Sequence, residues 1–201
     1  MSKVVFICLM LLFSTAVPAK SIVVLGDSIS AAYGMNPSKG WVQLLQQKLS
    51  QKNTSYIIFN ESISGDTTAG GLARIDKALS QYKPQLVLLE LGANDGLRGL
   101  SPKVMKSNLT EIINRVHKAG SKVLLLSMRI PPNYGKRYVD MFYNVYPQLA
   151  KELNIPFVPF ILQEVALLKE MMQKDGLHPN AKAQPIIADK IWHYLQPVLE
   201  L

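Results

Sequence analysis

The sequence predicts a three-layer α/β/α domain built on a five-stranded parallel sheet, and three observations support this fold class. First, five short apolar segments have the continuous, non-alternating pattern of strands that are covered on both faces. Second, segments with helical periodicity separate them, so strand and helix alternate along the chain. Third, 201 residues with 48% hydrophobic and 18% charged residues suit one folded domain with a sizeable core.

The predicted strands are short, and polar or glycine-bearing sequence follows most of them. They are Ile22–Leu25, Tyr56–Phe59, Gln85–Leu91, Lys122–Ser127 and Pro156–Phe160. Right-handed crossovers through helices connect such strands. For a chain of this length they favour a flavodoxin-like fold with the strand order 2-1-3-4-5.

Helical periodicity fills the segments between the strands. The first helix carries Trp41 on its apolar face, and the second carries Ile75. The third is bounded by Ser101-Pro102 and Gly120, because a cap residue, a proline at the first position and a glycine after the end are typical helix boundaries. Further helices are predicted over Tyr143–Leu153, Glu164–Met172 and Ala181–Leu199.

The N-terminus has the pattern of a secretory signal peptide. Lys3 precedes an apolar run, Val4–Phe13, and small residues follow up to Ala19. The run is too short to span a bilayer comfortably, which favours cleavage over a retained anchor. We therefore expect residues 1–19 to be a signal peptide and 20–201 to be the folded domain. The domain would be periplasmic or secreted, without stable membrane insertion after cleavage.

The composition excludes several classes of site. Cys8, the only cysteine, lies in the predicted signal peptide, so the mature chain would lack disulfides, a thiol nucleophile and cysteine-bound metal. The formal net charge of +8 comes from scattered lysines and arginines, which favour solubility or attract acidic substrates. No basic run with interleaved aromatic residues supports nucleic-acid binding. We expect a monomer with no metal and no cofactor.

Four polar, glycine-bearing loops are the candidate carriers of chemistry. They are Gly26–Ser30, Asn60–Thr68 and Gly92–Gly96, which follow strands one to three, and Asp175–Asn180, which precedes the last helix. The carboxyl ends of parallel strands share one edge of a sheet, so the first three loops gather there. The fourth loop joins them if the last helix packs beside strand one.

The residue types in these loops suit acyl transfer. Ser28 is a candidate nucleophile, which needs a general base within hydrogen-bond reach. His178 is a candidate base, and Asp175 three residues earlier is a candidate to orient it. The N–H groups of Ser28 and Gly65 and the side-chain amide of Asn94 are candidate oxyanion donors. Each loop taken alone has an ordinary alternative as a turn or a helix cap.

Taken together and in this order, the loops resemble the conserved blocks of the SGNH (GDSL) hydrolase family. The four letters of the name fall on Ser28, Gly65, Asn94 and His178. The resemblance covers essentially the whole mature chain, and Ile29 replaces the leucine of the GDSL motif conservatively. Three further runs are similar to a subgroup of exported, multifunctional bacterial esterases: Glu90–Gly99, Pro132–Tyr138 and Ala183–Pro185.

The resemblance implies an SGNH hydrolase fold and a serine esterase that works through a Ser-His-Asp triad and an acyl-enzyme intermediate. It implies that Ser28 is the nucleophile, that His178 is the base and then the acid, and that Asp175 orients it. The oxyanion hole would comprise Ser28, Gly65 and Asn94. Small-molecule substrates would be acyl thioesters, lysophospholipids and small carboxylic (aryl) esters.

Apolar residues expected near the same edge are candidates for an acyl-binding groove, although they would also serve simply to cover the sheet. They are Gly96, Leu97, Ile130, Pro131 and Tyr134. Arg98 is a candidate to meet a substrate phosphate or, equally, a solvated surface charge. In members of the family a mobile loop follows the asparagine block, and it corresponds here to Gly96–Ser101. Asp27 is expected to shape the turn that holds Ser28.

Three other functions stay open. A carbohydrate O-acetylesterase of the same fold would use the same residues. A nucleotide- or phosphate-binding module would use the loop after strand one, but neither a Gly-x-Gly-x-x-Gly motif nor a Walker loop is present. A catalytically inactive relative would bind lipid or carbohydrate, although every proposed active-site residue is present.

Overall fold

The structure is a computed structural model that describes residues 20–201. An all-parallel sheet forms its centre. The predicted signal peptide lies outside the described residues. The sheet has five strands in the order β2-β1-β3-β4-β5, which confirms the predicted topology. The strands are β1 (Lys20–Gly26), β2 (Tyr56–Asn60), β3 (Leu86–Glu90), β4 (Lys122–Leu126) and β5 (Phe157–Val158).

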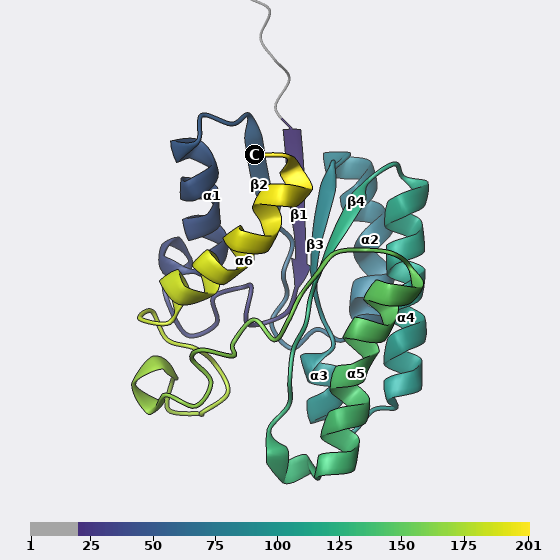
Figure 1. The fold of residues 1–201 in the computed structure, drawn as a ribbon, viewed down its shortest axis with the longest axis vertical. Coiled ribbons are helices and arrows are strands. Elements are labelled where there is room, and N and C mark those ends of the chain that lie inside the picture. The colour runs from purple at the N-terminus through teal and green to yellow at the C-terminus, as the bar shows by residue number, and fades with distance from the viewer. Residues whose placement is uncertain (1–19) are drawn as a thin grey trace, which may run out of the picture.

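Helices cover both faces of the sheet, so the predicted three layers are present (Figure 1). On one face, α1 (Trp41–Gln51) packs against α6 (Gln184–Leu199). On the other face, α4 (Pro102–Lys118) packs between α2 (Thr68–Tyr82) and α5 (Lys136–Glu152). A short helix, α3 (Ala93–Leu97), follows β3. Three 3-10 turns lie in loops, at Pro37–Lys39, Pro132–Tyr134 and Lys169–Met171.

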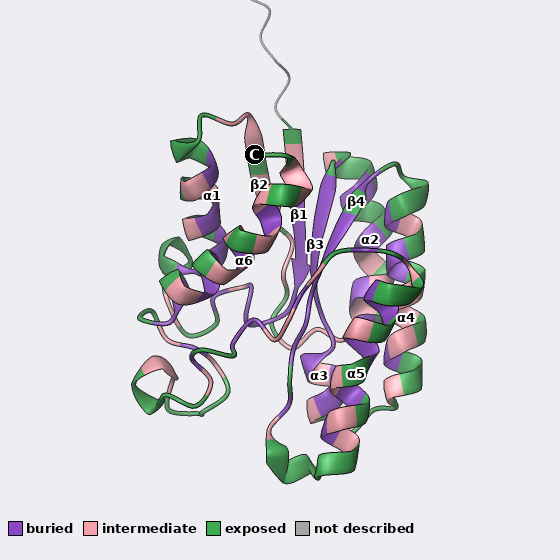
Figure 2. Ribbon diagram, in the orientation of Figure 1, coloured by how far each residue is buried: buried purple, intermediate pink, exposed green. Residues whose placement is uncertain are grey.

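The central strands form the core and bring the polar loops to one edge. All five residues of β3 are buried, as is β1 from Ile22 to Gly26 (Figure 2). This burial explains why their sequences are apolar without alternation. The register pairs Gly26 with Glu90 and Val24 with Asn60. The strands β1, β2 and β3 therefore end close together, and their loops start from the same edge.

The segment 164–172 does not form the predicted helix. It consists of successive turns that end in the 3-10 turn Lys169–Met171, and the side chain of Leu167 points out with 92% of the residue exposed. The side chain of Asn180 donates to the carbonyls of Glu170 (2.8 Å) and Met172 (3.1 Å). Backbone groups that a helix would pair locally are thus taken by a tertiary contact, which overrides local propensity.

The segment Gly92–Gly96, expected to be a loop, forms most of α3 instead. Asp95 is buried and accepts from the N–H and the hydroxyl of Thr68 (2.9 and 2.6 Å), which anchors α3 to the start of α2. A Cβ on Gly96 would lie 2.6 Å from Ile130 and 2.7 Å from Phe142. Gly96 therefore allows close packing inside a helix, and it does not have the surroundings of a hinge.

Two predicted boundaries also move. The helix expected over Tyr143–Leu153 begins earlier, at Lys136, and contains Pro147. The fifth strand is shorter than predicted: only Phe157 and Val158 pair with β4. Within residues 20–201, no helix is long and apolar enough to cross a membrane.

Candidate active site

A chain of hydrogen bonds joins the first and last polar loops. Nε2 of His178 lies 2.9 Å from Oγ of Ser28, and Nδ1 of His178 lies 2.7 Å from Oδ2 of Asp175. The Asp175 carboxylate can only accept, so Nδ1 carries the ring proton of a neutral His178 and Nε2 accepts from the Ser28 hydroxyl. This tautomer leaves Nε2 free to take the serine proton.

The Asp175 loop holds its own carboxylate in place. Oδ1 accepts from the N–H groups of Leu177 (2.9 Å) and His178 (3.0 Å), while Oδ2 faces the ring. Desolvation alone would raise the pKa of Asp175, but the hydrogen bonds from the His178 backbone and ring and from Leu177 outweigh it and lower its pKa to about 2. Asp175 is therefore ionised at neutral pH.

The turn after β1 places Ser28 at the edge of the sheet. Oδ1 of Asp27 accepts from the N–H of Ile29 at 3.0 Å, which confirms the expected turn-shaping role of Asp27. Ser28 is nearly buried, at 9% exposure. Its backbone N–H and that of Gly65 donate to no other group within residues 20–201, so both are free to bind an incoming oxyanion.

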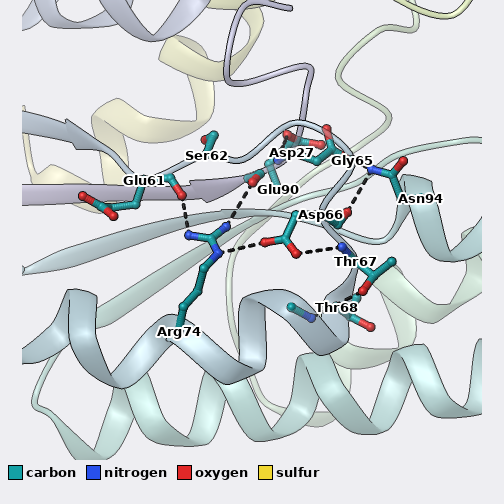
Figure 3. A network of polar contacts seen from close by, with 12 residues as sticks. Asp27, Glu61, Ser62, Gly65, Asp66, Thr67, Thr68, Arg74, Glu90 and Asn94 are labelled. Atoms are coloured by element: carbon teal, nitrogen blue, oxygen red, sulfur yellow. Dashed lines mark hydrogen bonds and ion pairs between the residues drawn. The ribbon is translucent and has the colours of Figure 1, made fainter.

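Arg74 fixes the Gly65 loop against the end of β1 (Figure 3). From α2, its Nε donates to Oδ2 of Asp66 at 2.8 Å, Nη1 donates to the carbonyl of Glu61, and Nη2 donates to the carbonyl of Gly26 at 3.2 Å. Charge-assisted bonds of this kind are short and directional. The guanidinium thus ties the loop that carries Gly65 to the strand that carries the serine.

Asn94 lies at the start of α3 and reaches both neighbouring loops. Its Nδ2 donates to the carbonyl of Asp66 at 2.9 Å and to Oδ2 of Asp27 at 3.1 Å (Figure 3). Both amide hydrogens are therefore engaged. An oxyanion that binds Asn94 has to share or replace one of these bonds.

Two residues that the sequence analysis missed connect the serine and histidine loops. The ring of Tyr33 lies over the His178 ring, with centroids 4.6 Å apart and planes tilted by 39°. Nε2 of Gln173 donates to the carbonyls of Tyr33 (2.7 Å) and Pro179 (3.2 Å). Neither residue belongs to a motif, so a single sequence offers no signal for them. Arg74 was missed for the same reason. Glu90 begins the run Glu90–Gly99 that carries the resemblance, but the sequence analysis gave it no role.

The candidate groove residues lie together, but they differ in exposure. Gly96 and Ile130 are buried and packed against each other, so they could line only the bottom of an acyl-binding groove. Leu97 and Pro131 are half-buried, and Tyr134 is exposed. The Tyr134 hydroxyl donates to the carbonyl of Leu97 at 2.9 Å, which joins α3 to the loop after β4.

Within residues 20–201, no group of three or more histidine, aspartate or glutamate side chains is arranged to hold a metal ion. The side chain of Arg98 is exposed beside the site and donates to the carbonyl of Gly65 at 2.7 Å. The arrangement is thus a hydroxyl hydrogen-bonded to an oriented imidazole, next to free backbone N–H groups, which suits acyl transfer.

Comparisons with known proteins agree with this geometry. Residues 24–185 match the model of the GDSL-like Lipase/Acylhydrolase family. An arylesterase of Vibrio mimicus is 47% identical over 189 residues, which cover 94% of this chain and 93% of that protein. The thioesterase 1/protease 1/lysophospholipase L1 of Escherichia coli K12 is 45% identical over 194 residues, covering 96% and 92% of the two chains.

A solved structure shows the same fold. The psychrotrophic esterase EstA from a Pseudoalteromonas species, inhibited by monoethylphosphonate, superimposes with a TM-score of 0.86 at 42% identity. The alignment covers 90% of this chain and all of that one. The family model, the identities and the shared fold together show that this chain belongs to the GDSL-like lipase/acylhydrolase family, the SGNH hydrolases.

Proposed function

We propose that this protein is a serine esterase that hydrolyses acyl thioesters, lysophospholipids and small carboxylic esters, aryl esters included, through an acyl-enzyme intermediate. One observation carries the proposal: a continuous hydrogen-bonded chain from Asp175 through His178 to Ser28. A serine hydroxyl is a weak nucleophile, and an oriented imidazole is the group that activates it.

The first half-reaction uses the tautomer that the geometry favours. Oγ of Ser28 attacks the acyl carbon while Nε2 of His178 takes its proton. The ionised Asp175 stabilises the imidazolium that forms and keeps the ring in place. His178 then returns the proton to the leaving alcohol or thiol, and the acyl group remains on Ser28. Water, activated by the same His178, hydrolyses the acyl-enzyme in the second half-reaction.

The oxyanion of each tetrahedral intermediate would be bound by the N–H groups of Ser28 and Gly65 and by the amide of Asn94. The two N–H groups need no rearrangement, because no internal acceptor occupies them within the described residues. Donors that are oriented before the reaction supply most of the stabilisation in such sites.

The relatives support the choice of substrates. The names of the Vibrio mimicus and Escherichia coli proteins describe aryl ester, thioester and lysophospholipid hydrolysis. The Pseudoalteromonas esterase is inhibited by a phosphonate, a class of reagent that esterifies activated serines. At 42–47% identity over nearly full length, we carry this range of substrates to the present chain.

Hydrolysis of p-nitrophenyl butyrate by the wild-type protein and by Ser28→Ala tests the proposal. We expect kcat/KM to fall by at least about 10⁴-fold in Ser28→Ala, because the nucleophile is lost. A fluorophosphonate should label the wild type at Ser28. It should still label Ser28 in the control variant Ser30→Ala. Equal hydrolysis by the wild type and Ser28→Ala would refute the proposal.

Chain length separates the long-chain esterase from a carbohydrate O-acetylesterase. Acetyl, octanoyl and palmitoyl esters of p-nitrophenol should be compared with lysophosphatidylcholine and an acetylated xylan. Activity confined to the acetyl compounds favours the O-acetylesterase, whereas octanoyl or longer substrates favour the esterase proposed here.

We also propose that the mature protein is a periplasmic monomer made by cleavage near Ala19. The charged and apolar pattern of residues 1–19 supports export. N-terminal sequencing of protein from a periplasmic extract tests the cleavage. Light scattering of the purified protein tests the oligomeric state.

A further inference from the structure

Two carboxyl groups lie buried beneath the candidate nucleophile, and the reaction described above does not use them. Asp27 precedes Ser28, and Glu90 ends β3. Both are fully buried, and the register places Glu90 opposite Gly26. Two adjacent carboxylates without a cation between them cannot both stay ionised in such a place.

The hydrogen bonds around the pair account for three of its four oxygens. Oε2 of Glu90 accepts from the Ser30 hydroxyl (2.7 Å) and from the N–H of Asp27 (3.3 Å). Oδ1 of Asp27 accepts from the N–H of Ile29 at 3.0 Å, and Oδ2 accepts from Nδ2 of Asn94 at 3.1 Å. Each of these oxygens accepts from a group that can only donate, or from a hydroxyl bound as a donor, which favours its unprotonated form. Each Asp27 oxygen keeps a second lone pair that can accept from a further donor.

The fourth oxygen is different. Oε1 of Glu90 is buried and has no hydrogen-bond partner within residues 20–201. The two carboxyl groups are neighbours, because the N–H of Asp27 donates to Oε2 of Glu90 at 3.3 Å and the register places Glu90 beside Gly26. A carboxylate oxygen left there would be an unpaired buried acceptor, whereas a protonated oxygen would have the Asp27 carboxylate as its acceptor.

We propose that Glu90 carries one proton on Oε1, donates it to the Asp27 carboxylate, and thereby makes Asp27 the acceptor that holds the side-chain amide of Asn94. The inference rests on the proposed function, because only there is Asn94 a donor to the oxyanion. Glu90 and Asp27 are positioning residues: neither contacts the reacting atoms, and both act through Asn94.

The electrostatics agree with this placement of the proton. Burial, followed by the charge of Asp27, raises the pKa of Glu90 well above its ordinary value. Burial also raises the pKa of Asp27 to about 6, while the bond from Ile29 opposes the rise. Burial thus favours the protonated form of both carboxyls, and the hydrogen-bond geometry places the proton on Glu90.

Other charged groups around the pair leave this assignment unchanged. Asp66 lies near enough to raise the pKa of Asp27, and His178 lies near enough to lower it. On α5, burial raises the pKa of Tyr146, and the charges of Glu90, Asp27 and Asp95 add to the rise. The nearest permanent cation is Arg74, but its guanidinium pairs with Asp66 and donates to the carbonyls of Glu61 and Gly26. Within the described residues it forms no ion pair with either carboxyl of the pair.

The proposal predicts different activities for the two amide substitutions, Glu90→Gln and Asp27→Asn, and this difference is the test. In Glu90→Gln, the side-chain oxygen accepts from Ser30 and Asp27 and the NH₂ donates to the Asp27 carboxylate, which is the pattern of the protonated acid. We expect kcat to stay within about threefold of the wild type. Glu90→Leu has neither group and should lose more than about tenfold.

In Asp27→Asn, one oxygen of the side chain becomes an NH₂ that must face either Ile29 or Asn94, both donors. We expect kcat to fall by more than about tenfold, as part of the 10²–10³-fold effect of an oxyanion donor, while KM changes by less than about threefold. Asp27→Asn in an Asn94→Ala background should cost little more, because Asp27 acts through Asn94.

Infrared spectroscopy of the folded protein in deuterium oxide detects the proton directly. At about pH 8, the wild type should show the carbonyl stretch of a protonated carboxylic acid, and Glu90→Gln should lack it. The wild-type band can be measured without any catalytic assay, and it stays informative even if one of the variants fails to fold. A wild type that shows the band but hydrolyses no ester would overturn the proposed function and leave the shared proton in place.

Three results would overturn the inference itself. The band is absent from the wild type, or it persists in Glu90→Gln and disappears in Asp27→Asn, which would place the proton on Asp27. Alternatively, Asp27→Asn and Glu90→Gln have equal activities, so that neither carboxyl positions Asn94. Circular dichroism and the melting temperature of each variant report whether it has folded.

Discussion

The ring of Tyr33 stacks on the ring of His178, with centroids 4.6 Å apart, although 51% of Tyr33 is exposed to solvent. An exposed aromatic side chain over an imidazole limits the rotation of that ring and shields one of its faces. The nucleophile turn thus supplies both the serine and part of the surroundings of its base.

Replacing Tyr33 with alanine should lower kcat/KM for p-nitrophenyl butyrate by about two- to tenfold, which corresponds to the loss of one aromatic contact. Tyr33→Phe keeps the ring and should retain wild-type kinetics. Steady-state assays of the two variants measure these changes in kcat/KM. If Tyr33→Phe falls as far as Tyr33→Ala, the hydroxyl matters and the stacking does not.

Gln173 joins the loops of the serine and the histidine, and its substitutions should show this. In Gln173→Glu, a carboxylate would face the carbonyls of Tyr33 and Pro179, which now accept from the amide. We expect a loss in kcat of about tenfold and a lower melting temperature, because two backbone carbonyls lose their donor and a carboxylate faces them instead.

Two further variants complete this test. Gln173→Met removes the donor without adding charge and should lose less than Gln173→Glu. Gln47→Glu, on the exposed face of α1, makes the same charge change away from the site and is the control. Wild-type kinetics in Gln173→Glu would show that the amide does not position the two loops.

Arg98 should influence the choice of substrate more than the chemistry. Its guanidinium is exposed beside Gly65, where a phosphate of a lysophospholipid would meet it. We expect Arg98→Gln to raise KM for a lysophospholipid by about two- to fivefold, the range of one exposed ion pair, and to leave KM for p-nitrophenyl butyrate unchanged. Lys77→Gln removes the same charge from the far part of α2 and should affect neither substrate.

The buried carboxyl pair should make stability depend on pH. In the folded protein, burial raises the pKa of Asp27 to about 6 and raises the pKa of Glu90 well above its ordinary value. The folded state therefore binds more protons than the unfolded chain above about pH 4. The free energy of unfolding therefore decreases as pH rises from about 4 through 6, by at most about 1.4 kcal/mol per pH unit for each proton.

Glu90→Gln removes one of these protons. Its stability relative to the wild type should increase with pH over the same interval, because Asp66, His178 and the other charged neighbours are common to both proteins and cancel. Urea denaturation of the two proteins between about pH 4.5 and 8 measures the difference. A constant difference would mean that Glu90 does not gain a proton on folding.

Much of the fold was predictable because its signals are local. Continuous apolar strands such as Leu86–Glu90 can be stable only when both faces are covered, and this requirement implies a parallel sheet with helices on each side. The predictions failed where distant contacts decide the outcome. The helix expected over Glu164–Met172 gave way to turns held by Asn180, and the loop expected at Gly92–Gly96 became helical once Asp95 was buried against Thr68.

The candidate site divides in the same way. The residue types of Ser28, His178 and Asp175 stand in recognisable motifs, so the sequence alone nominated them. It gave no role to Tyr33 or Gln173, since their significance lies in what they contact and not in their neighbours along the chain. Glu90 begins a run that resembles the family, but its contact with Asp27 appears only in the structure.

What the sequence by itself determined is the set of reactive groups and the sheet edge at which they would gather, because strand periodicity and loop chemistry are written in adjacent residues. The tertiary structure alone decided that His178 reaches Ser28 across 150 positions, and that Glu90 meets Asp27 under it. Those distances depend on strand register and on the packing of α6, which are set by the summed contacts of the whole core. The protonation of the buried pair follows from that packing, because burial, and not sequence, sets the cost of a second charge.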